Sequence, residues 1–163
     1  MILYHGTNTI ISNIDLSLSK PFKDFGKAFY LSEDINQAKE IANTRCSFSG
    51  GSPIINEYYF DESFLTSSNL KVKIFKEYSK EWAEFIILNR DERNSNAMHD
   101  YDIVYGPIAD DRVGLQLRKF KDEIITLEDL ANNLKYIKGI SFQYAFCTEK
   151  SIKTLQKNEH YII

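Results

Sequence analysis

The stretch Asp24-Phe25-Gly26-Lys27-Ala28-Phe29-Tyr30-Leu31-Ser32 decides how this sequence is interpreted. Gly26 and Lys27 suit a turn, and the apolar run that follows has the composition of a buried strand with Tyr30 near its end. Asp34, with Gln37 three residues later, then provides a capping-box pattern for a helix. The stretch therefore predicts a turn, a strand and a helix in immediate succession. The helix has one apolar face, made of Ile35, Ala38, Ile41 and Ala42.

Strands and helices are predicted in an irregular order on both sides of this stretch. Apolar and aromatic runs predict strands at 1–4, 54–61, 70–77, 101–105 and 141–147. Helices are expected after the capping residues Ser79, Thr126 and Thr148, the last of them running through Leu155. Residues 46–53 read as a flexible loop. Because regular strand–helix–strand alternation is missing, the pattern favours an α+β fold over a doubly wound sheet.

Length and composition limit the classes of protein that fit. A chain of 163 residues suits one domain spanning 1–163, and its 43% hydrophobic and 26% charged residues argue against disorder. The start of the chain has no signal-peptide pattern and no apolar run long enough for a membrane span, so a cytoplasmic protein is expected. The net charge of -3 provides no general basic field for nucleic acid, which would need a local patch. Two small cationic clusters are present, at Lys71, Lys73 and Lys76 and at Arg118, Lys119 and Lys121.

Several common cofactor and metal motifs are missing. The seven glycines form neither G-x-G-x-x-G nor a phosphate-binding P-loop, which argues against a Rossmann-type dinucleotide site. The two cysteines, Cys46 and Cys147, lie far apart and match no metal-ligand spacing or disulfide framework. A reducing compartment and a site without metal are therefore expected.

Three separate features carry weak chemical signals. His5 precedes Gly6 at a strand end, where an imidazole can bond a ligand and a glycine lets a ligand approach the backbone. Tyr30 ends the strand described above, and Gln143 interrupts an apolar strand. Each has a plain structural interpretation: a histidine bonded to a loop carbonyl, a buried tyrosine, and a glutamine facing solvent. Their order along the chain carries more information than any one of them.

This arrangement resembles the ADP-ribosyltransferase superfamily, in which three separated strands supply His, Tyr and Glu to a cleft for NAD. His5-Gly6-Thr7 is similar to the first motif of the diphtheria-toxin and poly-ADP-ribose-polymerase branch, and the segment from Gly26 to Tyr30 is similar to the second. Gln143 takes the place of the third. The resemblance is closer to a bacterial, toxin-like branch and covers nearly the whole chain. It rests on Asp24 to Tyr30, Trp82 to Arg90, Asp102 to Asp111 and Gln143 to Phe146.

The resemblance implies a split mixed β-sheet flanked by helices and a site that cleaves NAD at the nicotinamide–ribose bond. Tyr30, His5 and Gln143 are then the catalytic candidates. His5 is expected to bond a ribose hydroxyl, while Tyr30 and Gly6 hold the nicotinamide. The residues expected to bind NAD are His5, Gly6, Thr7, Gly26, Phe29, Tyr30 and Ser32.

The sequence departs from the family in two places. Gln143 offers no carboxylate to act as a general base or to stabilise positive charge. This favours transfer of a single ADP-ribose over chain elongation. The missing charge is sought in Asp102, Asp110 and Asp111, for which a capped turn is an equal alternative. Ala38 and Ile41 stand where the polymerase branch has a serine and a second tyrosine, so Phe29 or Phe25 is expected to provide the second stacking face.

The resulting hypothesis is an NAD-dependent mono-ADP-ribosyltransferase of the bacterial toxin kind, with a macromolecular acceptor, protein or nucleic acid, and a small cognate antitoxin protein as partner. A second interpretation is an inactive NAD-binding module on the same fold, because Gln143 replaces a carboxylate. A third is an enzyme with Cys46 or Cys147 as nucleophile, which no surrounding motif supports.

Overall fold

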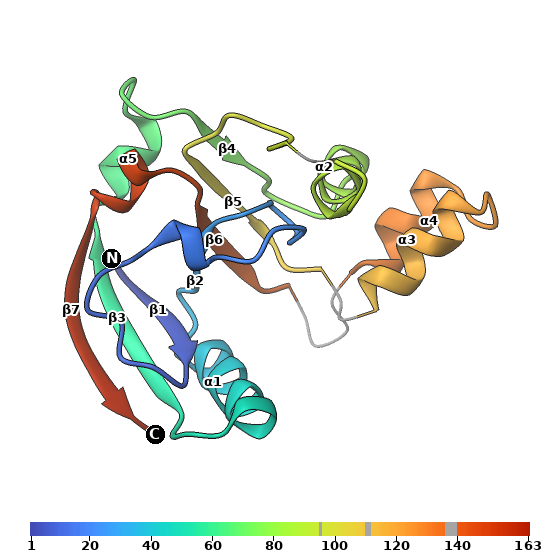
Figure 1. The fold of residues 1–163 in the computed structure, drawn as a ribbon. Coiled ribbons are helices and arrows are strands. Elements are labelled where there is room, and N and C mark those ends of the chain that lie inside the picture. Colours follow the sequence, from blue (N-terminus) through green and yellow to red (C-terminus); the bar gives the residue numbers. More distant parts are fainter. Residues whose placement is uncertain (95, 110–111, 136–139) are drawn as a thin grey trace.

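The strands form a three-stranded and a four-stranded sheet in a computed structural model that describes residues 1–94, 96–109, 112–135 and 140–163 (Figure 1). The three-stranded sheet has the order β1-β3-β7 and is antiparallel. The four-stranded sheet has the order β2-β6-β5-β4, and β4 and β5 make its parallel pair. The strands are β1 (Ile2–Thr7), β2 (Phe29–Leu31), β3 (Ile54–Phe60), β4 (Val72–Ile74), β5 (Ile103–Pro107), β6 (Phe142–Phe146) and β7 (Leu155–Ile162).

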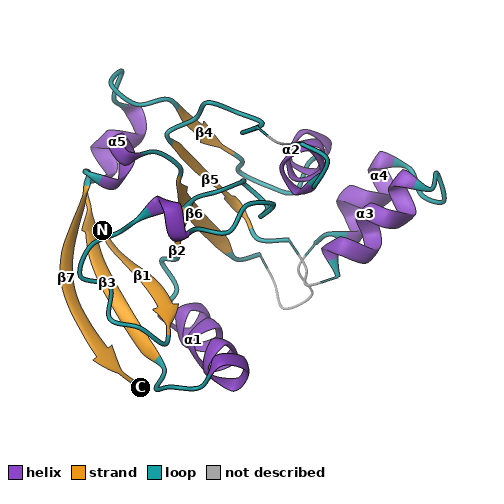
Figure 2. Ribbon diagram, in the orientation of Figure 1, coloured by secondary structure: helices purple, strands orange, loops and turns teal. Residues whose placement is uncertain are grey.

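The helices lie around these sheets and complete an α+β fold, as the sequence predicts (Figure 2). One helix packs on β1 and β3, and two others pack on each other beyond the four-stranded sheet. None of the described helices has the length and apolar character that a membrane crossing needs. The helices are α1 (Ile35–Ser49), α2 (Lys80–Arg90), α3 (Val113–Lys121), α4 (Leu127–Asn133) and α5 (Glu149–Ile152), with 3-10 turns at Leu16–Leu18 and Glu62–Thr66.

Side-chain caps fix where the predicted helices begin. Asp34 accepts a hydrogen bond from the Asn36 amide at 2.9 Å, and Ser79 accepts one from the Trp82 amide at 3.1 Å. Thr126 and Thr148 both form reciprocal capping boxes. These bonds satisfy amide groups that the first helical turn leaves unpaired. All four predicted helix starts are confirmed.

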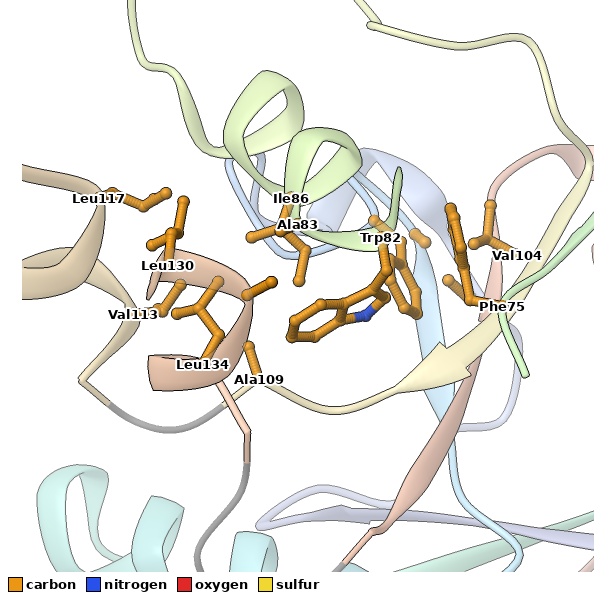
Figure 3. Close-up of a cluster of buried hydrophobic side chains, with 14 residues drawn as sticks. Phe75, Trp82, Ala83, Ile86, Val104, Ala109, Val113, Leu117, Leu130 and Leu134 are labelled. Carbon is orange, nitrogen blue, oxygen red and sulfur yellow. The ribbon is translucent and has the colours of Figure 1, made fainter. Parts of the chain in front are cut away.

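The buried side chains form separate clusters on the two faces of the four-stranded sheet. One face, carrying Val104 and Ala145, packs with helices α2, α3 and α4 around Trp82 (Figure 3). Trp82 is fully buried, and its indole N–H donates to the Pro107 carbonyl at 3.0 Å. The opposite face, which includes Phe146, packs toward the three-stranded sheet. Both faces of β6 are thus covered, which places Gln143 at the less buried end of an otherwise buried strand.

Two sequence-based predictions of elements are wrong, and one helix was missed. The loop predicted at 46–53 is helical up to Ser49, where Gly50 caps α1 with a positive φ of 71°. The last helix ends at Ile152 instead of running through Leu155, and β7 follows and pairs with β3. Helix α3 was not predicted, although its buried residues Val113 and Leu117 have helical spacing.

Candidate functional site

The edges of β1 and β2 meet at a single bridge and then separate. The Tyr4 amide donates to the Ser32 carbonyl at 2.8 Å, and the Ser32 amide donates to the Tyr4 carbonyl at 3.0 Å. Backbone groups of alternate residues in a strand point to the same edge, so the N–H and C=O of Gly6 face the side on which Tyr4 meets β2. The other edge of β1 is paired with β3. Gly6 therefore directs a donor and an acceptor into the split between the two sheets.

The glycine at position 6 is required by the packing of α1. A Cβ atom at Gly6 would lie 1.8 Å from the Ala38 carbonyl oxygen and 3.0 Å from the Ala42 nitrogen. Both are backbone-helix atoms that cannot move independently. The close approach expected of a ligand at this glycine is thus made by α1, and only the polar backbone edge of Gly6 is directed into the split.

His5 is held in one orientation and one tautomer. Its Nδ1 lies 2.8 Å from the Tyr30 carbonyl oxygen, which can only accept, so Nδ1 carries the proton. The ring stacks on Phe29 with a centroid distance of 4.5 Å and an interplanar angle of 24°. Burial, and to a smaller extent the charge of Arg45, lower the pKa of His5 to about 4 despite the bond to Tyr30. The neutral ring therefore keeps Nε2 as an acceptor at neutral pH, and no partner of Nε2 lies among the described residues.

Tyr30 is locked by its hydroxyl group. The hydroxyl accepts from the Phe25 amide at 3.1 Å and donates to the Gly26 carbonyl at 2.7 Å. Gly26 adopts a φ of +80°, and a side chain there would reach within 2.8 Å of the Asn89 amide oxygen. Burial and the negative charge of Asp24 raise the pKa of Tyr30 well above its usual value. Tyr30 is therefore a fixed, neutral aromatic side chain that holds the glycine turn against β2.

Gln143 is accompanied by a buried carboxylate that the sequence analysis did not select. The Gln143 amide nitrogen lies 3.5 Å from Oδ2 of Asp24, while Oδ1 of Asp24 accepts from Arg90 at 2.7 Å. The Asp24 side chain is only 8% exposed. Asp24 opens the stretch quoted above, but an aspartate before a glycine turn is so common that its type alone gave no signal. Asp24 therefore brings a carboxylate within hydrogen-bond distance of Gln143.

Two further predicted NAD contacts, Ser32 and Thr7, are buried and bonded within the protein. Ser32 is buried, donates to Gln37 and accepts from the Asp34 amide at 3.0 Å. Gln37 is therefore used by Ser32, and the predicted capping box with Asp34 is not observed. Thr7 is also buried, and its hydroxyl lies 3.4 Å from Nη1 of Arg45.

The second stacking face expected of Phe25 or Phe29 is not available. Phe25 is fully buried in the core with α2, and Phe29 is 7% exposed and covered by His5. The expectation for Phe25 is wrong because its ring has no face toward the split. At the two positions taken from the polymerase branch, Ala38 is buried against Gly6 and Ile41 is 49% exposed.

Asp102, one of the three acids considered as auxiliary groups, lies away from this cluster. Asp102 accepts from the Lys71 amide at 2.8 Å and from the Thr148 hydroxyl at 2.6 Å, which ties the start of β5 to α5. The register places Gly106 opposite Gln143, so Asp102 lies at the other end of the strand. Asp110 and Asp111 fall outside the described residues. Among the described residues, no group of three His, Cys, Asp or Glu side chains is placed to hold a metal ion.

Positive charge gathers beside the cluster despite the acidic net charge of the chain. Desolvation and the charges of Arg90, Lys20 and Arg45 lower the pKa of Lys23, while Asp24 opposes them. Arg45 reaches Thr7 next to the histidine, and Arg90 reaches Asp24 beside Gln143. Lys20, Lys23, Arg45 and Arg90 thus form a group of cations close enough to influence one another, which favours an anion nearby.

The comparisons with known proteins give a family without a known activity. A family model described as "Protein of unknown function (DUF3990)" matches residues 1–157. No curated protein and no solved structure matches the chain significantly. Because the family model covers almost all of its length, the chain belongs to the DUF3990 family.

Proposed function

We propose that this protein is an NAD-dependent mono-ADP-ribosyltransferase. The observation that carries the proposal is the meeting of three strands at one split: β1 provides His5 and the backbone of Gly6, β2 provides Tyr30, and β6 provides Gln143. These are the residues that the motif resemblance selects. They lie far apart in the sequence, yet His5 contacts the Tyr30 carbonyl and Gln143 lies on β6, the strand that pairs with β2.

The polar groups at the split complement NAD. The nicotinamide carboxamide has one donor group and one acceptor, which match the C=O and N–H that Gly6 directs away from β3. The neutral His5 accepts a ribose hydroxyl at Nε2 while Nδ1 stays on the Tyr30 carbonyl. The cations around Lys23 then suit the pyrophosphate.

Cleavage of the nicotinamide–ribose bond needs no proton transfer from the protein to the leaving group. The bond between the ribose C1′ and the nicotinamide nitrogen breaks, and the electron pair leaves with neutral nicotinamide. The acceptor then forms a bond to C1′ and gives up its proton. Gln143 can orient the ribose 2′-hydroxyl, and Asp24 supplies negative charge behind it that favours the oxocarbenium-like transition state. A neutral group at the third position favours single transfer over chain elongation.

Asp24 also explains why position 143 carries an amide. The Gln143 amide nitrogen donates to Asp24 at 3.5 Å, and a glutamate in its place would bring a second carboxylate to that distance. Two carboxylates so close disfavour ionisation of both. Gln143 with Asp24 thus places one negative charge near the split, in a different position from the carboxylate of the related enzymes.

The resemblance extends the proposal to a bacterial toxin that acts in the cytoplasm and is neutralised by a small antitoxin protein. The second candidate is an inactive NAD-binding module. The pairing of Asp24 with Arg90 favours it, because this ion pair reduces the negative charge available at the split.

The test is nicotinamide release from NAD by the purified protein, in buffer and in bacterial lysate. We expect His5→Ala and Gln143→Ala to reduce release by about 100-fold, the effect typical of removing one group that stabilises a transition state. Gln156→Ala, a change of the same type on the exposed surface of β7, should have no effect. NAD binding without release would establish the inactive module instead, and equal loss in Gln156→Ala would remove the assignment of Gln143.

A further inference from the structure

A second concave site lies next to the split, between the end of α2 and helix α3. It is a pocket of about 470 Å³. Arg90 contributes both to its wall and to the ion pair with Asp24, and Asp24 contacts Gln143. The pocket is thus linked to the candidate catalytic cluster through one side chain. Its lining residues are Phe22, Arg90, Asp91, Glu92, Arg93, Gly114, Leu117, Arg118 and Lys121.

The lining of this pocket carries an excess of positive charge. Its four cationic residues outnumber its two acidic ones. Asp91 is shared between Arg93 at 2.5 Å and Lys121 at 3.4 Å, and those cations hold the pKa of Asp91 well below its usual value. Arg118 is exposed and has no ion-pair partner among the described residues. One carboxylate thus faces two cations, and a third cation stands beside them, which suits a ligand with more than one phosphate.

Phe22 adds an aromatic wall in a strained conformation. Its φ is +58°, in the left-handed region that a bulky residue rarely adopts. A glycine at this position would avoid the strain, because it has no Cβ atom. Because backbone strain of this kind gathers at ligand-binding sites, a phenylalanine among arginines at this position points to a ring that a ligand uses.

We propose that this pocket binds a single-stranded nucleic acid, with a base stacked on Phe22 and the flanking phosphates on Arg118 and Lys121. Aromatic rings beside cations are the means by which proteins hold single strands without reading their sequence. The inference rests on the proposed function in one respect, since it identifies the nucleic acid as the acceptor of ADP-ribose. In that reaction a nitrogen or oxygen of the strand bonds to C1′ and loses its proton to solvent, while nicotinamide leaves with the bonding electron pair.

The net charge of -3 limits the length of nucleic acid that the protein can contact. A chain with no general positive field holds a strand only where its cations gather, so the contact is short and sensitive to salt. Helix α3 offers a matched pair of positions. Arg118 lines the pocket, whereas Lys119, the next residue on the same helix, does not.

The experiment measures fluorescence anisotropy of labelled 12-nucleotide single-stranded DNA and RNA of mixed sequence, without NAD. We expect Arg118→Glu to weaken binding by about ten-fold or more, and Lys119→Glu to leave it nearly unchanged. Phe22→Gly should weaken binding by about five-fold or more, because one base stack is lost, and Phe22→Tyr should retain it. Phe22→Gly suits the observed backbone, and a thermal melt confirms that each variant is folded.

Equal effects of the two α3 substitutions would overturn the inference, because binding would then follow charge alone. Undiminished binding in Phe22→Gly would also overturn it. The same holds if inorganic polyphosphate displaces the strand equally well from Phe22→Gly and from the natural protein, because Phe22 would then add nothing to binding. Nicotinamide release is measured separately. Release without nucleic-acid binding would refute the pocket and leave the proposed function intact, whereas binding without release would support the pocket and refute the proposed function.

Discussion

The buried, neutral state of His5 should make the folded protein less stable in mild acid, because only the unfolded chain then binds a proton at this histidine. The folded pKa of His5 is about 4, against 6.5 for an unperturbed histidine. Between these two values the unfolded chain binds a proton that the folded chain does not. The free energy of unfolding therefore falls as the pH falls, by about 1.4 kcal/mol for each pH unit. From pH 7.5 to pH 5.0 the loss from His5 amounts to about 2 kcal/mol.

Urea denaturation at these two pH values measures the loss. His5→Asn retains a side-chain N–H for the Tyr30 carbonyl but cannot titrate, so its loss of stability should be about 2 kcal/mol smaller over the same range. His160→Asn, at an exposed position on β7, is the control and should behave like the natural sequence.

An NMR titration of the His5 ring gives the pKa directly. A midpoint near 6.5, or equal pH dependence in His5→Asn and the natural sequence, would refute the burial argument. It would also remove the assignment of Nε2 as a permanent acceptor. If the midpoint lies near 4, the NAD binding proposed for His5 should not change between pH 6 and pH 8, because the ring is neutral throughout that range.

Three further predictions concern other parts of the molecule. Gly6→Ala should destabilise the protein by about 3 kcal/mol in urea denaturation, because α1 must shift. Gly114→Ala, with open space around its Cβ, should be neutral or stabilising. Equal effects would contradict the packing of α1 on β1. Cys147, whose pKa burial raises to about 12, should resist iodoacetamide at pH 8 in the native protein, and its rapid alkylation in a peptide map would show the site to be exposed. Gln143→Glu should destabilise by about 1–4 kcal/mol through repulsion from Asp24, and adding Asp24→Asn should recover part of that loss; additive losses in thermal melts would mean that the two side chains do not interact.

The elements that the sequence predicted correctly are those that local chemistry determines. Ser79 and Thr126 begin helices because their side chains bond amides three residues ahead. Strand β7 was missed because its partner, β3, lies about a hundred residues away and its polar, exposed edge shows no alternation of apolar residues. Thr148 correctly predicted a helix start, but nothing local indicates that the helix ends after four residues.

In the candidate site, too, local sequence identified the residues but not their long-range contacts. His5, Tyr30 and Gln143 were found because motifs carry them, but the bonds that set their state were not visible. The Asp24 carboxylate bonds Arg90 across 66 residues and Gln143 across 119. From sequence alone Gln143 was a lost carboxylate, and the charge was sought in the neighbouring acidic run. In the fold the Gln143 amide lies beside the buried Asp24 carboxylate, so under the proposed function the negative charge of the site comes from Asp24 and not from position 143.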